Sequence, residues 1–170
     1  MVTPSRFQHI LRVAHLAQSI AVGNGFNESE RHATLLAALL HDAARDLPPE
    51  ELFQLAPPGD ELERGHPLSL HGRAGRRLAE QWGVRDERVL GAITGHVFGV
   101  DLNDRVGMAV YVADVSEPGR GVNDDIRELA ICELAAAYRR AVDSKVRYLR
   151  SHCKAIHPET LKVYEAIHNT

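Results

Sequence analysis

LLAALLHDAARD, residues 35–46, places a run of helix-forming apolar residues directly before His41 and Asp42. Adjacent side chains on a helix diverge by about 100°, so these two reach a common object only if that object is large. A metal cluster is such an object, because an imidazole binds one ion while the two oxygens of a carboxylate can bridge two. An isolated His-Asp pair is more often a helix-end cation beside a solvated turn residue. The rest of the chain decides between these interpretations.

Apolar periodicity and capping residues predict helices along nearly the whole chain. Thr3 followed by Pro4 opens the first helix, and Asn27 with Glu30 forms a capping box that opens the second. Residues 118–122 are typical of a loop, and no segment has a convincing strand pattern. The sequence therefore predicts an all-α irregular bundle of about seven or eight helices, over residues 4–23, 27–45, 50–55, 67–82, 87–96, 105–115, 124–150 and from 158 onwards.

Length and composition fit a soluble single domain. The chain has 170 residues, 44% of them hydrophobic and 25% charged, with a formal net charge of −3. Domains commonly run to about 100–150 residues, and this charge gives no basic field for nucleic acid or an anionic membrane. Cys132 and Cys153 are too few for a disulfide framework, and the sequence shows neither a secretory leader nor a membrane-spanning run. We expect a cytoplasmic protein that begins near Met1.

Ligand-type side chains lie on five of the predicted helices, and a bundle places such residues in its interior when they converge on metal. Four imidazoles and two carboxylates suit iron, manganese, zinc or nickel better than calcium or magnesium, which prefer oxygen ligands. Six ligands are more than one tetrahedral ion needs. They favour two ions about 3.5–4 Å apart with Asp42 between them. The six candidates are His9, His41, Asp42, His71, His96 and Asp114.

A single buried histidine is more often a hydrogen-bonded structural residue than a metal ligand, so each candidate depends on the joint pattern. The histidines outside that pattern are interpreted as surface or structural residues. Of these, His66 stands nearest to a candidate ligand in the sequence and could approach the mouth of the site. They are His15, His32, His66, His152, His157 and His168.

In this pattern the chain resembles the HD-domain metal phosphohydrolases, whose signature is an early histidine, a His-Asp pair and a later aspartate. More narrowly, it is similar to their YqeK-like branch. The resembling stretches follow one another along almost the whole chain: residues 6–9 with Val13, 37–45, 70–72, 92–93 with His96, 113–114 with 117–120, and 156–160. The resemblance implies one HD domain over residues 1–170, with a metal-binding core of about residues 3–120 and C-terminal helices of about 123–168.

The resemblance also implies an activity. Members of the YqeK-like branch are symmetrical diadenosine tetraphosphate hydrolases with a di-iron centre, and they release two ADP. By this resemblance the metal ligands are His9, His41, Asp42, His71, His96 and Asp114, and the expected metal is iron, with manganese, nickel or zinc as alternatives. Two such ions would make hydroxide available from a bound water near neutral pH and neutralise phosphate oxygens. Asp42 and Arg45 are the expected catalytic residues.

Two arginines are candidates for binding substrate phosphate. Arg45 stands four residues after His41, hence on the same face if the helix continues that far. Arg120 follows the Asp114 helix after a short Pro-Gly turn. A lone arginine is more often a solvated surface charge, so these assignments depend on the motif context. Nothing in the sequence assigns a role to Asp46 or Glu117.

The chain departs from the branch at two positions. Arg45 stands where lysine is usual, which keeps the positive charge but replaces a point donor with a planar fork. Val97 stands where threonine usually follows the fifth-helix histidine, which removes a hydroxyl near the expected site and puts a detail of substrate or ligand contact in doubt.

Other functions remain open from the sequence. One alternative is another HD-type phosphohydrolase that acts on mononucleotides or cyclic dinucleotides, and a second is a metal- or nucleotide-binding module without turnover. The intact ligand set argues against the second. The expected partner is a dinucleoside polyphosphate or a nucleotide, with ADP as product. We expect no nucleic acid or membrane partner, and a homodimer is compatible with the sequence.

Overall fold

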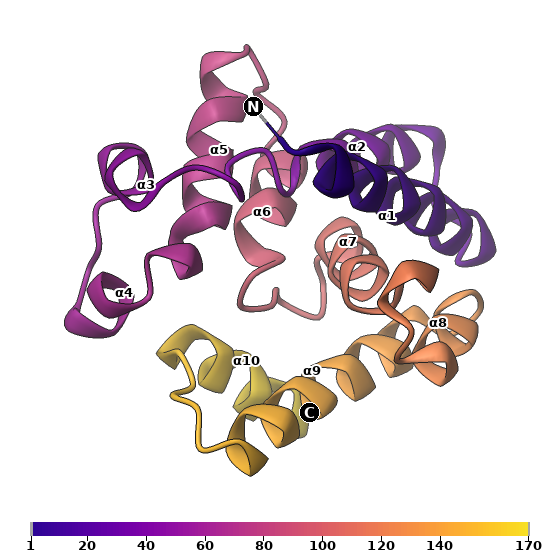
Figure 1. Ribbon diagram of the computed structural model, residues 1–170. Coiled ribbons are helices and arrows are strands. Elements are labelled where there is room, and N and C mark those ends of the chain that lie inside the picture. The colour runs from indigo at the N-terminus through magenta and orange to yellow at the C-terminus, as the bar shows by residue number, and fades with distance from the viewer. Residues whose placement is uncertain (1, 170) are drawn as a thin grey trace.

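The computed structural model describes residues 2–169, which form ten α-helices and two 3₁₀ turns without a β-strand (Figure 1). This confirms the all-α prediction, although the helices outnumber the seven or eight expected. None of the described helices is both long and apolar enough to cross a bilayer. The elements are α1 Pro4–Gly23, α2 Glu28–Leu40, α3 Pro49–Leu55, α4 Glu61–Gly65, η1 Pro67–Leu70, α5 His71–Gln81, α6 Glu87–Gly95, α7 Arg105–Ser116, η2 Pro118–Arg120, α8 Asp124–Ala130, α9 Leu134–Ser151 and α10 Pro158–His168.

α1 and α2 pack side by side against the central α7 (Figure 1). Both begin as predicted: the Thr3 hydroxyl accepts a hydrogen bond from the backbone of Arg6, and Asn27 and Glu30 cap each other's backbone N–H groups. Small and branched apolar side chains fill the interface between these helices, where they are fully excluded from solvent. This packing brings the N-terminal part of α1 beside the end of α2.

α5 and α6 approach each other closely because Gly72 has no side chain. A Cβ atom at Gly72 would lie 2.7 Å from the carbonyl oxygen of Thr94 and 2.8 Å from Cγ2 of Val97, distances that real Cβ atoms do not show. The contact lies at the first turn of α5 and the last turn of α6. It places His71 next to His96, with ring centroids 4.8 Å apart.

The prediction of one helix over residues 124–150 is wrong, because the chain breaks between α8 and α9. The Asn24 side chain, at the end of α1, donates to the carbonyl of Ala130 at 2.8 Å and accepts from the backbone of Leu134 at 3.0 Å. It thus provides hydrogen bonds to the end of one helix and the start of the next, where a continuous helix would use its own backbone. α9 then runs along the lower side of the molecule with α10 beside it (Figure 1).

Four smaller differences concern helix ends and short helical turns. α2 stops at Leu40 rather than near Arg45, and residues 41–46 form consecutive tight turns, with Arg45 N bonded to Asp42 O at 3.0 Å. The residues from Pro67 to Leu70 form a 3₁₀ turn before α5, and the expected loop at 118–122 contains η2. α4 was not predicted; it is a single short turn capped by Asp60.

Candidate metal centre

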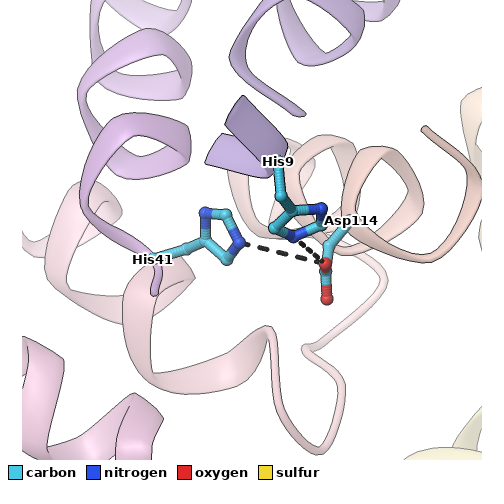
Figure 2. Close-up of side chains that lie close together, drawn as sticks. All are labelled: His9, His41 and Asp114. Atoms are coloured by element: carbon cyan, nitrogen blue, oxygen red, sulfur yellow. Dashed lines mark ion pairs between the residues drawn. The ribbon is translucent and has the colours of Figure 1, made fainter. Parts of the chain in front are cut away.

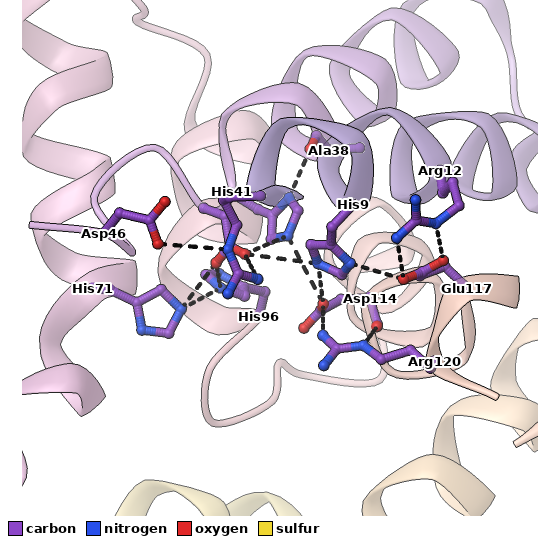
Figure 3. A network of polar contacts seen from close by, with 12 residues as sticks. His9, Arg12, Ala38, His41, Asp46, His71, His96, Asp114, Glu117 and Arg120 are labelled. Atoms are coloured by element: carbon purple, nitrogen blue, oxygen red, sulfur yellow. Dashed lines mark hydrogen bonds and ion pairs between the residues drawn. The ribbon is translucent and has the colours of Figure 1, made fainter. Parts of the chain in front are cut away.

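The structure brings all six predicted ligand residues together from five places in the fold. His9 comes from the second turn of α1, His41 and Asp42 from the turn after α2, and the others from α5, the end of α6, and α7. Five of the six are buried and Asp114 is partly buried. Figure 2 shows His9 and His41 directed toward the carboxylate of Asp114, and Figure 3 shows the wider polar network around them.

The two oxygens of Asp42 face two different groups of imidazoles. Its Oδ2 lies 3.5 Å from Nε2 of His41 and 3.7 Å from Nε2 of His9. Its Oδ1 lies 3.3 Å from Nε2 of His71 and 3.6 Å from Nε2 of His96. The tight turn after α2 permits this, because it carries Asp42 into the centre of the cluster while His41 stays at one side.

Asp114 completes the first of these groups. Its Oδ1 lies 3.0 Å from Nε2 of His9 and 3.9 Å from Nε2 of His41. The six residues therefore divide into one group of His9, His41 and Asp114 and a second of His71 and His96, with Asp42 shared by both.

Hydrogen bonds fix the imidazoles with their Nε2 atoms turned inward. Nδ1 of His41, His71 and His96 each lies 2.6–2.7 Å from the carbonyl oxygen of the residue three positions earlier. A carbonyl only accepts, so each Nδ1 carries the proton and each neutral ring presents a lone pair at Nε2. Nδ1 of His9 faces a carboxylate oxygen of Glu117 at 3.0 Å, with the same result.

These inward lone pairs are unsatisfied without a cation. Nε2 of His9 and Nε2 of His41 are buried and have no hydrogen-bond partner among the described residues. Nε2 of His71 and Nε2 of His96 lie 2.9 Å apart, and both rings already donate through Nδ1. Metal ions fit this arrangement, because they accept lone pairs from several nitrogens at once and neutralise the two carboxylates.

The local electrostatics favour neutral rings at His41 and His71 and an ionised carboxylate at Asp42, whereas His9 is an exception. Burial lowers the pKa of His41 to about 4 and lowers that of His71, so both rings are neutral at neutral pH. Burial opposes ionisation of Asp42, but the imidazoles of His71 and His96 beside its Oδ1 hold its pKa well below the usual range. Burial also disfavours protonation of His9, yet the carboxylates beside it raise its pKa. Neutral imidazoles beside ionised carboxylates are the forms that bind metal.

Glu117 is a site residue whose role the sequence did not reveal. It is 1% exposed, and besides holding His9 it accepts hydrogen bonds from Nε of Arg12 and from the backbone N–H of Gly119, both at 2.6 Å. Burial disfavours its charge, but the donors, Arg12 first, lower the pKa of Glu117 to about 2. A permanent carboxylate behind a ligand histidine orients the ring and raises its basicity.

Arg6 is a second residue that the sequence analysis did not assign. Its Nη1 donates to Oδ2 of Asp42 at 2.9 Å. Arg6 stands three residues before His9, and on a helix this spacing places both on one face, which is the signal that could have identified it. Asp46 lies 3.8 Å from Nε of Arg6 and accepts hydrogen bonds from the backbone and hydroxyl of Thr3, so it fastens the start of α1.

The two candidate phosphate ligands lie at the cluster and differ in whether their guanidinium groups already have partners. Arg120 is engaged: its Nη2 lies 2.5 Å from Oδ1 of Asp114 and its Nε donates to the carbonyl of the same residue at 2.9 Å. Arg45 is partly buried and makes no side-chain hydrogen bond or ion pair within residues 2–169. Burial lowers its pKa, while the charges of Asp42 and Asp114 act against this. The helix does not continue to Arg45 as assumed, so it is the turn that brings it to the site.

A cavity of about 200 Å³ lies where the C-terminal segments meet this half of the molecule. His157 was expected to be a bystander, but it stacks on Phe98 with ring centroids 3.9 Å apart and lies 3.2 Å from a carboxylate oxygen of Glu63. His66, which is exposed, also lines this cavity, and the remaining bystander histidines are exposed as well. The lining residues are Leu62, His66, Ser69, Val97, Phe98, Lys145, Leu149, Ala155, His157 and Thr160.

Comparison with known proteins gives consistent results. A family model described as "HD domain" matches residues 6–119. The chain is 33% identical to a "Probable nicotinate-nucleotide adenylyltransferase/Ap4A hydrolase" of Mycoplasma genitalium, over 81% of this chain but 41% of that longer protein. It is 29% identical to a "Bis(5'-nucleosyl)-tetraphosphatase, symmetrical" of Bacillus subtilis, over 96% of this chain and 89% of that one. A crystal structure of an HD superfamily hydrolase "involved in NAD metabolism" from Clostridium acetobutylicum matches with TM-score 0.88 and 28% identity, over 99% of this chain and 91% of that one.

Proposed function

The chain belongs to the HD domain family of hydrolases, and we propose that it cleaves diadenosine tetraphosphate symmetrically into two ADP. The names of the Bacillus subtilis and Mycoplasma genitalium relatives support this substrate. The observation that carries the proposal is the position of Asp42, whose two oxygens face two separate groups of inward-directed imidazoles.

We propose that one ion is held by His9, His41 and Asp114, a second by His71 and His96, and that Asp42 binds both. Such a pair of ions supplies an activated water as nucleophile and a clamp for the phosphate oxygens. Iron is the proposed metal, with manganese, nickel or zinc as alternatives, because the donors are mixed nitrogen and oxygen.

The residues around the cluster would bind and orient the polyphosphate. Arg45 carries a guanidinium that no carboxylate within residues 2–169 occupies, so it is available for bidentate binding of a phosphate group. Arg120 is bound to Asp114. We propose that another N–H group of the same guanidinium donates to a substrate phosphate beside Asp114. Glu117 and Arg6 hold His9 and Asp42 in position while the substrate binds.

A symmetrical cut requires the middle of the tetraphosphate to lie over the cluster, with one nucleoside diphosphate on each side. The cavity of about 200 Å³ beside Val97 offers room for part of one half, and the stacked rings of Phe98 and His157 form one of its walls. Aromatic faces of this kind bind nucleobases by stacking. A cytoplasmic location, a homodimer and a single domain over residues 1–170 stay predictions.

Separation of the products by ion-exchange chromatography tests the proposal. Protein loaded with iron or manganese under anaerobic conditions should convert diadenosine tetraphosphate to ADP alone. Equimolar AMP and ATP would show that the phosphate register is wrong. Rapid hydrolysis of a mononucleotide or a cyclic dinucleotide, with no cleavage of diadenosine tetraphosphate, would favour a different HD-type phosphohydrolase, and binding without any product would favour a module without turnover.

A further inference from the structure

Lys145 is a partly buried cation that has no carboxylate partner within residues 2–169. It lies on α9, and its ammonium donates a hydrogen bond to the carbonyl of Val97, the residue after His96. An ammonium has three donors, and within residues 2–169 this is the one hydrogen bond that Nζ makes, with no ion pair. Burial of a charge is costly unless the charge is paired, and the partly buried ammonium of Lys145 retains donors for a further acceptor.

The surroundings of Lys145 keep it positive. Burial lowers its pKa to about 8, and the negative charge of Asp114 acts against that shift. The ring of Tyr111 lies beside the ammonium, with its centroid 5.6 Å from Nζ. Because a pKa of about 8 lies above neutral pH, most Lys145 side chains are protonated under ordinary conditions.

Lys145 lines the cavity of about 200 Å³ beside the metal centre, and that cavity has a second unsatisfied polar group. The hydroxyl oxygen of Ser69 is buried and has no hydrogen-bond partner among the described residues. Ser69 stands two residues before His71 and Val97 one residue after His96, so the cavity lies beside the second group of the centre. A cation and a hydroxyl donor in one cavity are the groups that bind a phosphate.

We propose that Lys145 binds a phosphate group of the nucleotide, donating to a phosphate oxygen in the cavity beside the His71 and His96 group of the centre. The C-terminal helix α9 thereby contributes a charged group to substrate binding, although no ligand of the metal centre lies on it. The identity of the nucleotide rests on the proposed function, whereas the phosphate contact does not.

Lysine NMR tests this on the unaltered chain, because the sequence contains three lysines, Lys145, Lys154 and Lys162. Protein labelled with ¹³C at lysine Cε and loaded with zinc, which is diamagnetic, is titrated separately with ADP and with inorganic pyrophosphate. Both probes should move the Lys145 resonance, while the exposed Lys154 and Lys162 serve as internal controls. A Lys145 resonance unmoved at saturation, with the ligand bound, would overturn the proposal.

Substitution gives the second measurement. Lys145→Met should raise the Kd of ADP and the KM for diadenosine tetraphosphate at least tenfold, with full metal content and a Tm no lower than that of the parent. Lys145→Arg should recover part of the loss because the charge returns. A Kd within twofold of the parent in Lys145→Met would overturn the proposal. Cleavage to ADP with no effect at Lys145 rejects this inference alone, whereas an ADP-dependent shift without any cleavage rejects the proposed function alone.

Discussion

Replacing Glu117 with glutamine should weaken one metal site and spare the other. The Glu117 carboxylate accepts from Nδ1 of His9 at 3.0 Å on one oxygen, and from Arg12 and the Gly119 backbone at 2.6 Å on the other. Glutamine has the same size but only one acceptor oxygen. Its NH₂ group must therefore face either the His9 N–H or the other two donors, and in both orientations the charge behind His9 is lost.

The expected magnitude follows from the position of Glu117 behind a ligand. Loss of such a partner lowers metal affinity roughly 10–100-fold, or about 1.4–2.7 kcal/mol. The loss should fall on the ion held by His9, His41 and Asp114, since Glu117 makes no hydrogen bond or ion pair with His71 or His96. The Glu117 carboxylate supports metal binding fully above its ordinary pKa of 4.5, and this support is lost only as the pH falls toward the lowered pKa of about 2. The loss of metal affinity in Glu117→Gln should therefore be the same at pH 6 and pH 8.

Equilibrium dialysis against graded free manganese, followed by elemental analysis, measures both sites. The parent should bind two ions, and Glu117→Gln should bind one at concentrations that fill both in the parent. Glu63→Gln is a matched control: Glu63 is equally buried and also pairs with an arginine and a histidine, Arg73 and His157, but touches no candidate ligand. Unchanged affinity of both sites in Glu117→Gln would refute the reasoning.

Three further predictions concern packing, substrate binding and metal removal. Gly72→Ala should lower the free energy of unfolding by about 1–3 kcal/mol through overpacking and weaken the His71 side of the centre. Gly91→Ala is the control, because its added Cβ would meet its nearest atom at 4.0 Å. This control should fold normally by circular dichroism. Arg45→Ala should raise KM or lower kcat with full metal content, and Arg45→Lys should be tolerated; an unchanged kcat/KM in Arg45→Ala would make it an ordinary surface charge. Removal of both metal ions by a chelator should lower Tm by about 10–20 °C relative to protein at 100 times the Kd, since binding at that excess stabilises by about 2.7 kcal/mol per site, or about 5.4 kcal/mol for two. An equal Tm would exclude a metal centre that stabilises the fold.

The sequence predicted most of the fold because helix starts are local. The caps at Thr3 and Asn27 involve residues three apart, and the structure contains both. The break between α8 and α9 could not be predicted in this way. It depends on Asn24, which lies 110 residues before Leu134 and meets it only after folding.

The candidate site likewise combines residues that the sequence identified with long-range contacts that it did not reveal. The six ligand-type residues could be selected because histidine and aspartate are rarely placed on apolar helix faces without a partner. Their supporting contacts are long-range: Arg6 reaches Asp42 over 36 residues, and Glu117 reaches His9 over 108. Lys145 lies 48 residues after Val97, to which it donates, and has no spacing that connects it to the motifs.

The most direct test of this account is the metal content of Asp42→Ala beside that of His71→Ala. Each protein is purified anaerobically, reconstituted with iron or manganese, freed of excess metal and analysed for bound metal per chain. The parent should hold two ions and His71→Ala one, because His71 belongs to one group of the centre. Asp42→Ala should lose both, because Oδ2 of Asp42 faces the His9 and His41 group while Oδ1 faces the His71 and His96 group. Two ions retained in Asp42→Ala, or the loss of one alone, would contradict the shared role of Asp42.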